Sequence, residues 1–250
     1  MTETTLYIVR HGKTMFNTIE RVQGWCDTPL TKQGQEGIHY LGRGLKNVDF
    51  SFAYSSDSGR AIETARIILG EHSKGKEIPY FIEKRIREWC FGSLEGGYDM
   101  EMWGVIPRVL NFKTYDEMFT TEVSFEQIAN AVYNLDTAGW AETYETLRDR
   151  VWTGFEDIAH HCEKNGGGNV LVVSHGLTIA FLLNLIDPKQ PVRAGLLNGS
   201  VTKVTYANGR FSIHGINDTS YIDNGKTHSR DSFLSWGYFN FYQRIIKGKV

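Results

Sequence analysis

The stretch LYIVRHGKT, residues 6–14, begins with apolar residues typical of a buried strand and ends with charged and polar residues that are uncommon in a hydrophobic core. Residues 6–9 form a short continuous apolar run, which is typical of a strand covered on both faces. Arg10, His11 and Gly12 follow directly. In open α/β sheets, ligands bind beyond the carboxyl ends of the strands. The stretch therefore predicts a functional site where this strand ends.

Two further strand ends carry polar side chains of the same kind. Residues 170–173 form another apolar run, which is closed by His175 and Gly176. A strand is also predicted over 51–54, and Arg60 falls in the first turn of the helix that follows it. Because parallel strands end at the same edge of a sheet, we expect these side chains to gather beside those of the first strand.

Helices and a hairpin complete the pattern. Thr31 is predicted to cap a helix, and an apolar helix is predicted over about 178–186. Asn208 and Gly209 form a type I′ turn signal between two segments of alternating polarity. That combination predicts a hairpin at an edge of the sheet.

Two segments depart from this alternation of strands and helices. Residues 95–160 place aromatic and acidic side chains at helical spacings without a clear strand, which predicts a helical insertion over the sheet. Residues 221–250 are dense in aromatics and are expected to form a packed C-terminal cover or a contact in a homo-oligomer. The predicted fold class is α/β, a three-layer α/β/α sandwich with a mostly parallel mixed sheet, as a single domain over residues 1–250.

Composition and charge exclude several classes of protein. The 250 residues are 41% hydrophobic and 22% charged, as in an ordinary globular protein, and the net charge of −2 lacks the basic excess of nucleic-acid or anionic-membrane binders. The three cysteines, Cys26, Cys90 and Cys162, are too scattered for a disulfide framework or a CxxC metal site. We therefore expect a cytoplasmic protein with no metal, no cofactor, no nucleic acid and no membrane as partner.

The residues that gather at the strand ends suit a phosphate dianion. Guanidinium groups such as those of Arg10 and Arg60 offer paired donors to phosphoryl oxygens, and glycines let backbone N–H groups approach closely. A neutral imidazole in such surroundings can attack phosphorus and form a phosphohistidine. His11 is the candidate nucleophile.

The leaving alkoxide of a phosphate ester needs a proton. Glu88, in Arg87-Glu88-Trp89, is the candidate acid if aromatic surroundings and partial burial raise its pKa. The residues alone leave Glu95 and Glu83 open as alternatives.

Six segments of the chain resemble the histidine phosphatase superfamily, also called the phosphoglycerate mutase-like family. In chain order they are LYIVRHGKT with Asn17 downstream, QGWCDTPLT followed by Gly34, YSSDSGRAIETA, REWCFGSLEG, VVSHG and LLNGSV. The resemblance covers residues 5–220 and implies the fold of that family.

The resemblance also implies a role for each gathered residue. His11 would be the phosphorylated nucleophile, and Glu88 would donate and accept the proton. The phosphoryl group would be held by Arg10, Arg60 and His175. Further phosphate or substrate contacts are implied for Asn17, Gln23, Gly24 and the backbone of Gly176.

Hydrolysis and mutase activity both fit a phosphohistidine. The mutases of the family carry an adjacent pair of arginines in the insertion, whereas here Arg108 and Lys113 are isolated among acidic residues. The sequence therefore favours a phosphatase for small phosphorylated metabolites over a mutase that depends on bisphosphoglycerate. A third possibility is a catalytically silent member that binds phosphorylated ligands or a protein partner, and the complete set of site residues argues against it.

Overall fold

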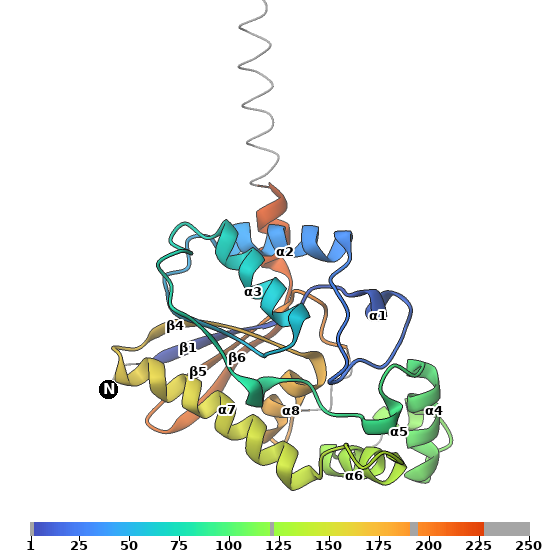
Figure 1. Cartoon of the computed structure of the whole chain (residues 1–250). Coiled ribbons are helices and arrows are strands. Elements are labelled where there is room, and N and C mark those ends of the chain that lie inside the picture. The colour runs from blue at the N-terminus through green and yellow to red at the C-terminus, as the bar shows by residue number, and fades with distance from the viewer. Residues whose placement is uncertain (1–2, 121–122, 191–194, 228–250) are drawn as a thin grey trace, which may run out of the picture.

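A six-stranded sheet organises the molecule (Figure 1). The structure is a computed structural model that describes residues 3–120, 123–190 and 195–227. The strands pair in the order β3-β2-β4-β1-β5-β6. Neighbours among β1 to β4 are parallel, and β5 and β6 are antiparallel, so the predicted mixed and mostly parallel sheet is confirmed. The strands are β1 (Thr4–Arg10), β2 (Phe50–Ser55), β3 (Tyr80–Ile82), β4 (Gly168–Ser174), β5 (Val201–Ala207) and β6 (Arg210–Asp218).

The central strand β1 is covered on both faces. It lies between β4 and β5, and its side chains alternate between two cores. Leu6 and Ile8 belong to one core, and Tyr7 and Val9 face the other. This position explains why the sequence shows an unbroken apolar run instead of alternating polarity.

Helices form a layer on each face of the sheet, which confirms the predicted three-layer sandwich (Figure 1). Ile38 and Ile68 anchor the helices of one layer, and Phe155 and Phe181 anchor those of the other. The first layer contains α2 (Lys32–Leu45) and α3 (Gly59–Glu71), and the second contains α7 (Tyr144–Lys164) and α8 (Gly176–Ile186). A short helix, α1 (Met15–Thr18), follows β1.

Local capping places the helix starts. Thr31 caps α2 as predicted, because its hydroxyl accepts a hydrogen bond from the backbone N–H of Gly34 at 2.9 Å. Helix α8 begins at Gly176, two residues before the predicted start at 178. The earlier start is stabilised because the Glu88 carboxylate accepts the N–H groups of Leu177 and Thr178, a contact that local sequence does not reveal.

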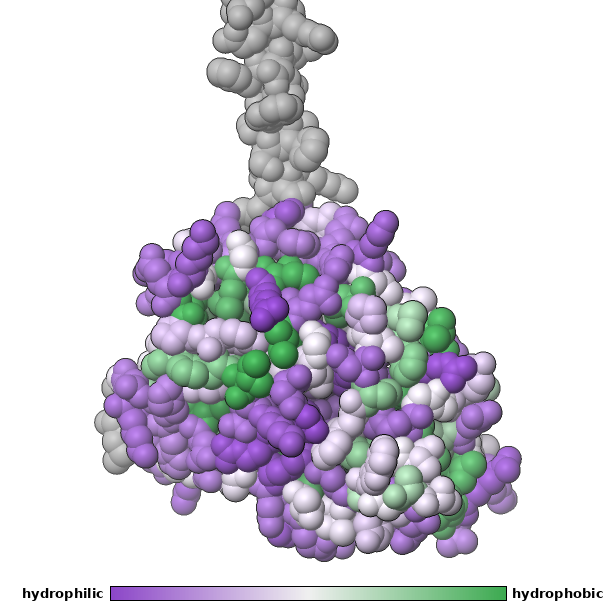
Figure 2. Space-filling model, viewed as in Figure 1, coloured by the Kyte–Doolittle hydropathy of each residue, from purple (hydrophilic) through white to green (hydrophobic). Residues whose placement is uncertain are grey.

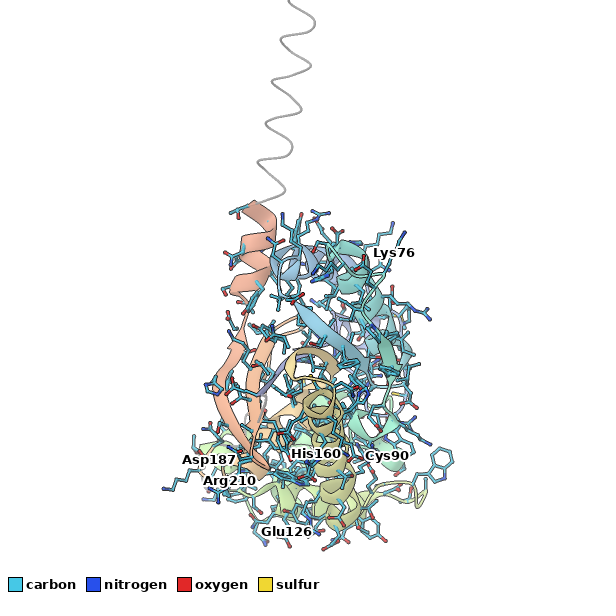
Figure 3. All side chains as sticks on the ribbon, turned by 90° about the vertical axis from the view of Figure 1, so that its left-hand side faces the viewer. Lys76, Cys90, Glu126, His160, Asp187 and Arg210 are labelled. Atoms are coloured by element: carbon cyan, nitrogen blue, oxygen red, sulfur yellow. The ribbon has the colours of Figure 1, made fainter. Side chains whose placement is uncertain are left out.

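The predicted insertion over 95–160 is shorter than expected. Its helices are α4 (Asp99–Val109), α5 (Tyr115–Thr120) and α6 (Phe125–Leu135). Helix α7 belongs to the sheet layer instead, because Val151 and Phe155 pack in the core against the strands. Figure 3 shows Glu126, in α6, at the end of the molecule opposite Lys76, which follows α3.

The remaining predictions concern the edge strands of the sheet and the C-terminal segment. The predicted hairpin is confirmed, with Asn208 and Gly209 at φ +54° and +74° between β5 and β6. Strand β3 was not predicted, because three residues are too few to show an alternating pattern. Residues 220–227 are helical, and most of the predicted aromatic segment, 228–250, lies outside the described residues.

The surface and the helices add two general observations. The face in Figure 2 is largely hydrophilic, and its apolar residues form small separate groups. Within the part of the chain that the structure describes, none of the helices has the length and apolarity that a bilayer crossing requires.

Two glycines of α2 offer a paired test of packing beside the end of β1. A Cβ on Gly34 would lie 2.1 Å from the backbone oxygen of Lys13, whereas a Cβ on Gly37 would meet nothing within 4 Å. We expect Gly34→Ala to lower the free energy of unfolding by about 1–3 kcal/mol. Gly37→Ala should leave it unchanged or raise it by up to about 1 kcal/mol. Urea denaturation of both variants measures the difference, and equal effects would contradict this packing.

Candidate active site

A cavity of about 260 Å³ opens at the carboxyl ends of β1 and β4. Its walls come from the strand ends, from the start of α8 and from the insertion. Six of the predicted site residues line it, namely Arg10, His11, Asn17, Gln23, Glu88 and Gly176. Arg60, His175 and Gly24 are not among the lining residues.

His11 is a buried imidazole on the cavity wall, with 4% of its surface exposed. Its Nδ1 lies 2.8 Å from the carbonyl oxygen of Gly12. Because a carbonyl only accepts, Nδ1 carries the proton and Nε2 keeps its lone pair. Burial, followed by the charges of Arg60 and Arg10, holds the pKa of His11 well below its usual value. The ring is therefore neutral, as a nucleophile must be.

Arg60 is fully buried at the start of α3, and its charge acts on His11. Its Nη1 donates to the carbonyl of Cys26 at 2.9 Å and to Asp27 Oδ1 at 2.8 Å. Its Nη2 donates to the carbonyl of Gly24 at 2.8 Å and meets His175 Nδ1 at 3.0 Å. These contacts use four of the five N–H donors of a guanidinium.

The remaining donor of Arg60 indicates what the site is built to hold. Its Nε is buried without a protein partner, and the same is true of Nε of Arg10, whose Nη1 donates to the carbonyl of Leu196. Buried cationic donors are costly when they are left unsatisfied. An anion bound in the cavity that Arg10 and His11 line would supply the kind of acceptor that such donors lack.

His175 supports Arg60 in the structure. Since Arg60 donates to Nδ1, the proton of His175 sits on Nε2, which donates to Ser56 Oγ at 2.6 Å. Burial and the charge of Arg60 hold the pKa of His175 well below its usual value. Its ring lies 5.1 Å from that of His11, between centroids. Both nitrogens are engaged by protein groups, so a direct contact with a phosphoryl group stays a prediction.

Ser56 does not cap a helix, although its place in the sequence suggests that role. The cluster of Ser55, Ser56 and Asp57 reads as a helix-capping segment. The residue before α3 is Ser58, however, and it makes no side-chain capping bond. Ser56 is instead the partner of His175, a role that sequence reasoning missed.

Gly24 serves the turn that surrounds Arg60. Its N–H donates to Glu95 Oε2 at 3.0 Å, and its carbonyl accepts from Arg60. A Cβ at this position would lie 2.1 Å from the backbone oxygen of Trp89, so only glycine fits. The structure therefore gives Gly24 a place in the turn and none on the cavity wall.

Glu88 reaches the cavity from the segment after β3, with 7% of its surface exposed. Its Oε1 accepts from the N–H of Trp89 at 3.1 Å and from the N–H and hydroxyl of Thr178 at 2.9 Å each. Its Oε2 accepts from the N–H of Leu177 at 3.0 Å. The prediction asked for aromatic surroundings and partial burial; Glu88 is buried, and Phe91 and Trp103 line the same cavity, but the groups that bind its carboxyl oxygens are polar donors at the start of α8.

The two alternative acids have structural partners. Glu95 accepts backbone N–H groups from Gly24, Trp25 and Cys26, and Glu83 pairs with Arg85. Neither Glu95 nor Glu83 lines the cavity. Of the three candidates, Glu88 is the one positioned to reach a bound ester.

Polar side chains in and beside the cavity were also absent from the sequence prediction. Asn198 donates to the carbonyl of His11 at 3.0 Å and to Asn17 Oδ1 at 3.2 Å, and it lies in the LLNGSV segment that already pointed to the family. Arg21 and Asp99 line the cavity, and burial raises the pKa of Asp99. The segments that carry Arg21 and Asp99 come together only in the fold, through the bridge between Arg21 and Tyr98, so no local motif predicts that these two residues share a site.

The adjacent His160 and His161 do not form a metal site. His160 meets the Tyr206 hydroxyl and His161 meets the Tyr54 hydroxyl, so the two rings point apart. Across residues 3–120, 123–190 and 195–227, no group of three or more His, Cys, Asp or Glu side chains is placed to hold a metal ion.

The family model of the histidine phosphatase superfamily (branch 1) matches residues 6–219. This chain belongs to the histidine phosphatase superfamily. Within that superfamily it is similar to a probable phosphoglycerate mutase, GpmB, of Salmonella choleraesuis, with 28% identity over 226 residues that cover 87% of this chain and 94% of the relative.

Solved structures of the histidine phosphatase fold agree. A phosphoglycerate mutase from Bacillus anthracis superposes with a TM-score of 0.85 at 38% identity, covering 90% of this chain and 97% of the other. YhfR of Bacillus stearothermophilus gives 0.64 at 30% identity, covering 88% and 99%. A phosphoserine phosphatase of Entamoeba histolytica, at 0.63 and 23% identity over 88% and 99% of the chains, shares the fold.

The two neutral histidines make stability depend on pH. Both pKa values are lowered in the folded chain, so below about pH 6.5 the unfolded chain binds more protons and stability falls as the pH falls. Between pH 7 and pH 5, His11 alone should account for a loss of about 2 kcal/mol in the free energy of unfolding.

Urea denaturation at both pH values, for the natural chain and for His11→Asn, measures this contribution. The variant should lose less stability on acidification than the natural chain. His214→Gln, at an exposed position, is the control that should behave like the natural chain. An equal loss in the natural chain and His11→Asn would show that His11 is not held neutral.

Proposed function

We propose that this chain is a phosphomonoester hydrolase for small phosphorylated metabolites and works through a phosphohistidine at His11. One observation carries the proposal. A neutral, buried imidazole with a free Nε2 lone pair lines a cavity together with Arg10, and the Nε groups of Arg10 and of Arg60 are buried without a protein partner. That arrangement suits a nucleophile and the oxygens of a phosphoryl group.

The proposed reaction has two halves. In the first, Nε2 of His11 forms a bond to phosphorus, the ester P–O bond breaks, and Glu88 gives a proton to the leaving oxygen. In the second, water attacks phosphorus, its proton passes to Glu88, and the N–P bond breaks to release inorganic phosphate. Arg10 and Arg60 stabilise charge on the phosphoryl oxygens in both halves.

The insertion supports hydrolysis over phosphoryl transfer within a retained substrate. Its residues on the cavity wall are Asp99, Met102 and Trp103, which bring no positive charge. Arg108 and Lys113 are exposed and are not among the described residues that line the cavity. A bisphosphorylated intermediate needs a closed and basic enclosure to be retained.

A mutase is the second candidate. It is favoured by the names of the similar proteins from Bacillus anthracis and Salmonella choleraesuis. Efficient interconversion of phosphoglycerates that depends on bisphosphoglycerate would establish the mutase and overturn the hydrolase.

Labelling tests the nucleophile. With an aryl phosphate substrate in EDTA, the natural chain should release inorganic phosphate and, after quenching, carry an acid-labile and base-stable phosphoryl label. His11→Ala should lose the label and reduce kcat by roughly a thousand-fold or more. A label that persists in His11→Ala would place the nucleophile elsewhere, and no label with any phosphate ester would favour the silent binding protein.

Leaving-group dependence tests the acid. An alkyl alcohol needs a proton to depart, whereas p-nitrophenolate departs readily without one. Glu88→Gln should therefore reduce kcat/KM, which reports the first half-reaction, by about 10²–10⁴-fold on an alkyl phosphate and much less on p-nitrophenyl phosphate. Glu101→Gln, at an exposed position in α4, is the control. Equal losses on the two esters would show that Glu88 does not supply the proton.

A further inference from the structure

A partly buried arginine outside the cavity, Arg150, holds the segment that carries Glu88. Arg150 lies in α7, and its side chain is 13% exposed. Its Nη1 donates to the carbonyls of Arg85 and Arg87 at 2.9 Å each, and its Nη2 donates to the carbonyl of Glu88 at 2.9 Å. One guanidinium thus binds three backbone carbonyls around the candidate acid.

Glu142 fixes the guanidinium of Arg150 in turn. Its Oε1 accepts from Nε and its Oε2 from Nη2, both at 2.5 Å, and its side chain is almost fully buried. With these two bonds all five N–H donors of Arg150 are used. Glu142 also accepts the N–H of Cys90 at 3.3 Å, so the pair contacts the segment on both sides of Glu88.

The Glu88 segment depends on such contacts because it has little regular structure of its own. It follows a short 3₁₀ turn, Lys84–Ile86, and runs beside α7 (Figure 1). The side chain of Glu88 is held by α8, through Leu177 and Thr178, while the backbone behind it is held by α7 through Arg150. Two helices therefore hold Glu88, one through its side chain and the other through its backbone.

We propose that Arg150, oriented by Glu142, is the positioning residue for proton transfer by Glu88. This inference rests on the proposed phosphatase reaction. Arg150 does not line the cavity, so it acts through the backbone of the Glu88 segment and not through the substrate. Small displacements of a proton donor cost rate in the step that needs the proton, and a lysine cannot replace the planar fork that meets three carbonyls.

The experiment compares Arg150→Met and Arg150→Lys with Arg148→Met, a matched control on the same helix whose arginine is exposed and pairs with its neighbour Asp149. On an alkyl phosphate, both Arg150 variants should lose about 10- to 100-fold in kcat/KM, which reports the first half-reaction. On p-nitrophenyl phosphate, the loss in kcat/KM should stay within about three-fold. Arg148→Met should match the natural chain on both esters.

Arg150→Met leaves Glu142 buried without its partner, which alone can unfold a chain. The double variant Glu142→Gln with Arg150→Met removes both charges and should show the same selective loss on the alkyl ester. Thermal denaturation of each variant checks that the compared proteins are folded.

Equal losses on the two esters, or no loss on either, would overturn the positioning role while leaving the hydrolase intact. Failure of the proposed function would instead appear in the labelling experiment, as the absence of a phosphoryl label on His11 in the natural chain. The two failures are therefore distinguishable.

Discussion

The buried charge of Arg60 is the constraint on which the site depends. A guanidinium with no exposed surface has to be matched by oppositely charged or polar groups from several parts of the chain. The turn after α1 supplies two carbonyls and Asp27, and the end of β4 supplies His175. Satisfying one side chain thus brings together three distant segments and fixes His175, whose ring lies 5.1 Å from that of His11 between centroids.

The same charge shapes the chemistry of its neighbours. Burial is the larger cause of the lowered pKa values of His11 and His175, and the charge of Arg60 lowers both further, so their rings stay neutral. Arg60 also leaves one donor, Nε, unpartnered in the interior. A site that is slightly short of acceptors when empty attracts an anion, and that shortage is a physical reason to expect phosphate chemistry here.

The sequence was sufficient for the strands that are buried on both faces and for the residues at their ends. Residues 6–9 and 170–173 are continuous apolar runs because β1 and β4 are the two central strands, and His11 follows directly where β1 ends. Prediction failed where a segment was too short to show a pattern, or where it had the same pattern as the segment before it. Strand β3 has three residues, and α7 has the same amphipathic spacing as the insertion, so its packing on the sheet was not visible.

For the site, local motifs identified the groups but not their partners. The sequence pattern suggests a helix-capping role for Ser56, but in the fold its hydroxyl is the hydrogen-bond partner of His175. The family resemblance implies a ligand contact for Gly24, but its backbone N–H donates to Glu95 and its carbonyl accepts from Arg60. The contact between Arg150 and the carbonyl of Glu88 joins residues 62 positions apart and involves a backbone atom, which has no sequence signature. Long-range hydrogen bonds to backbone atoms are therefore the part of the site that could not be predicted from the sequence.

The insertion has a consequence for how such an enzyme can change. Helix α4 supplies Asp99, Met102 and Trp103 to one wall, whereas every predicted catalytic residue comes from outside α4 to α6. Under the proposed function, recognition of the alcohol portion falls to α4, and handling of the phosphoryl portion falls to residues outside the insertion. We therefore expect exchange of the α4–α6 module to alter which phosphate ester is accepted and to leave the phosphoryl-binding residues unchanged.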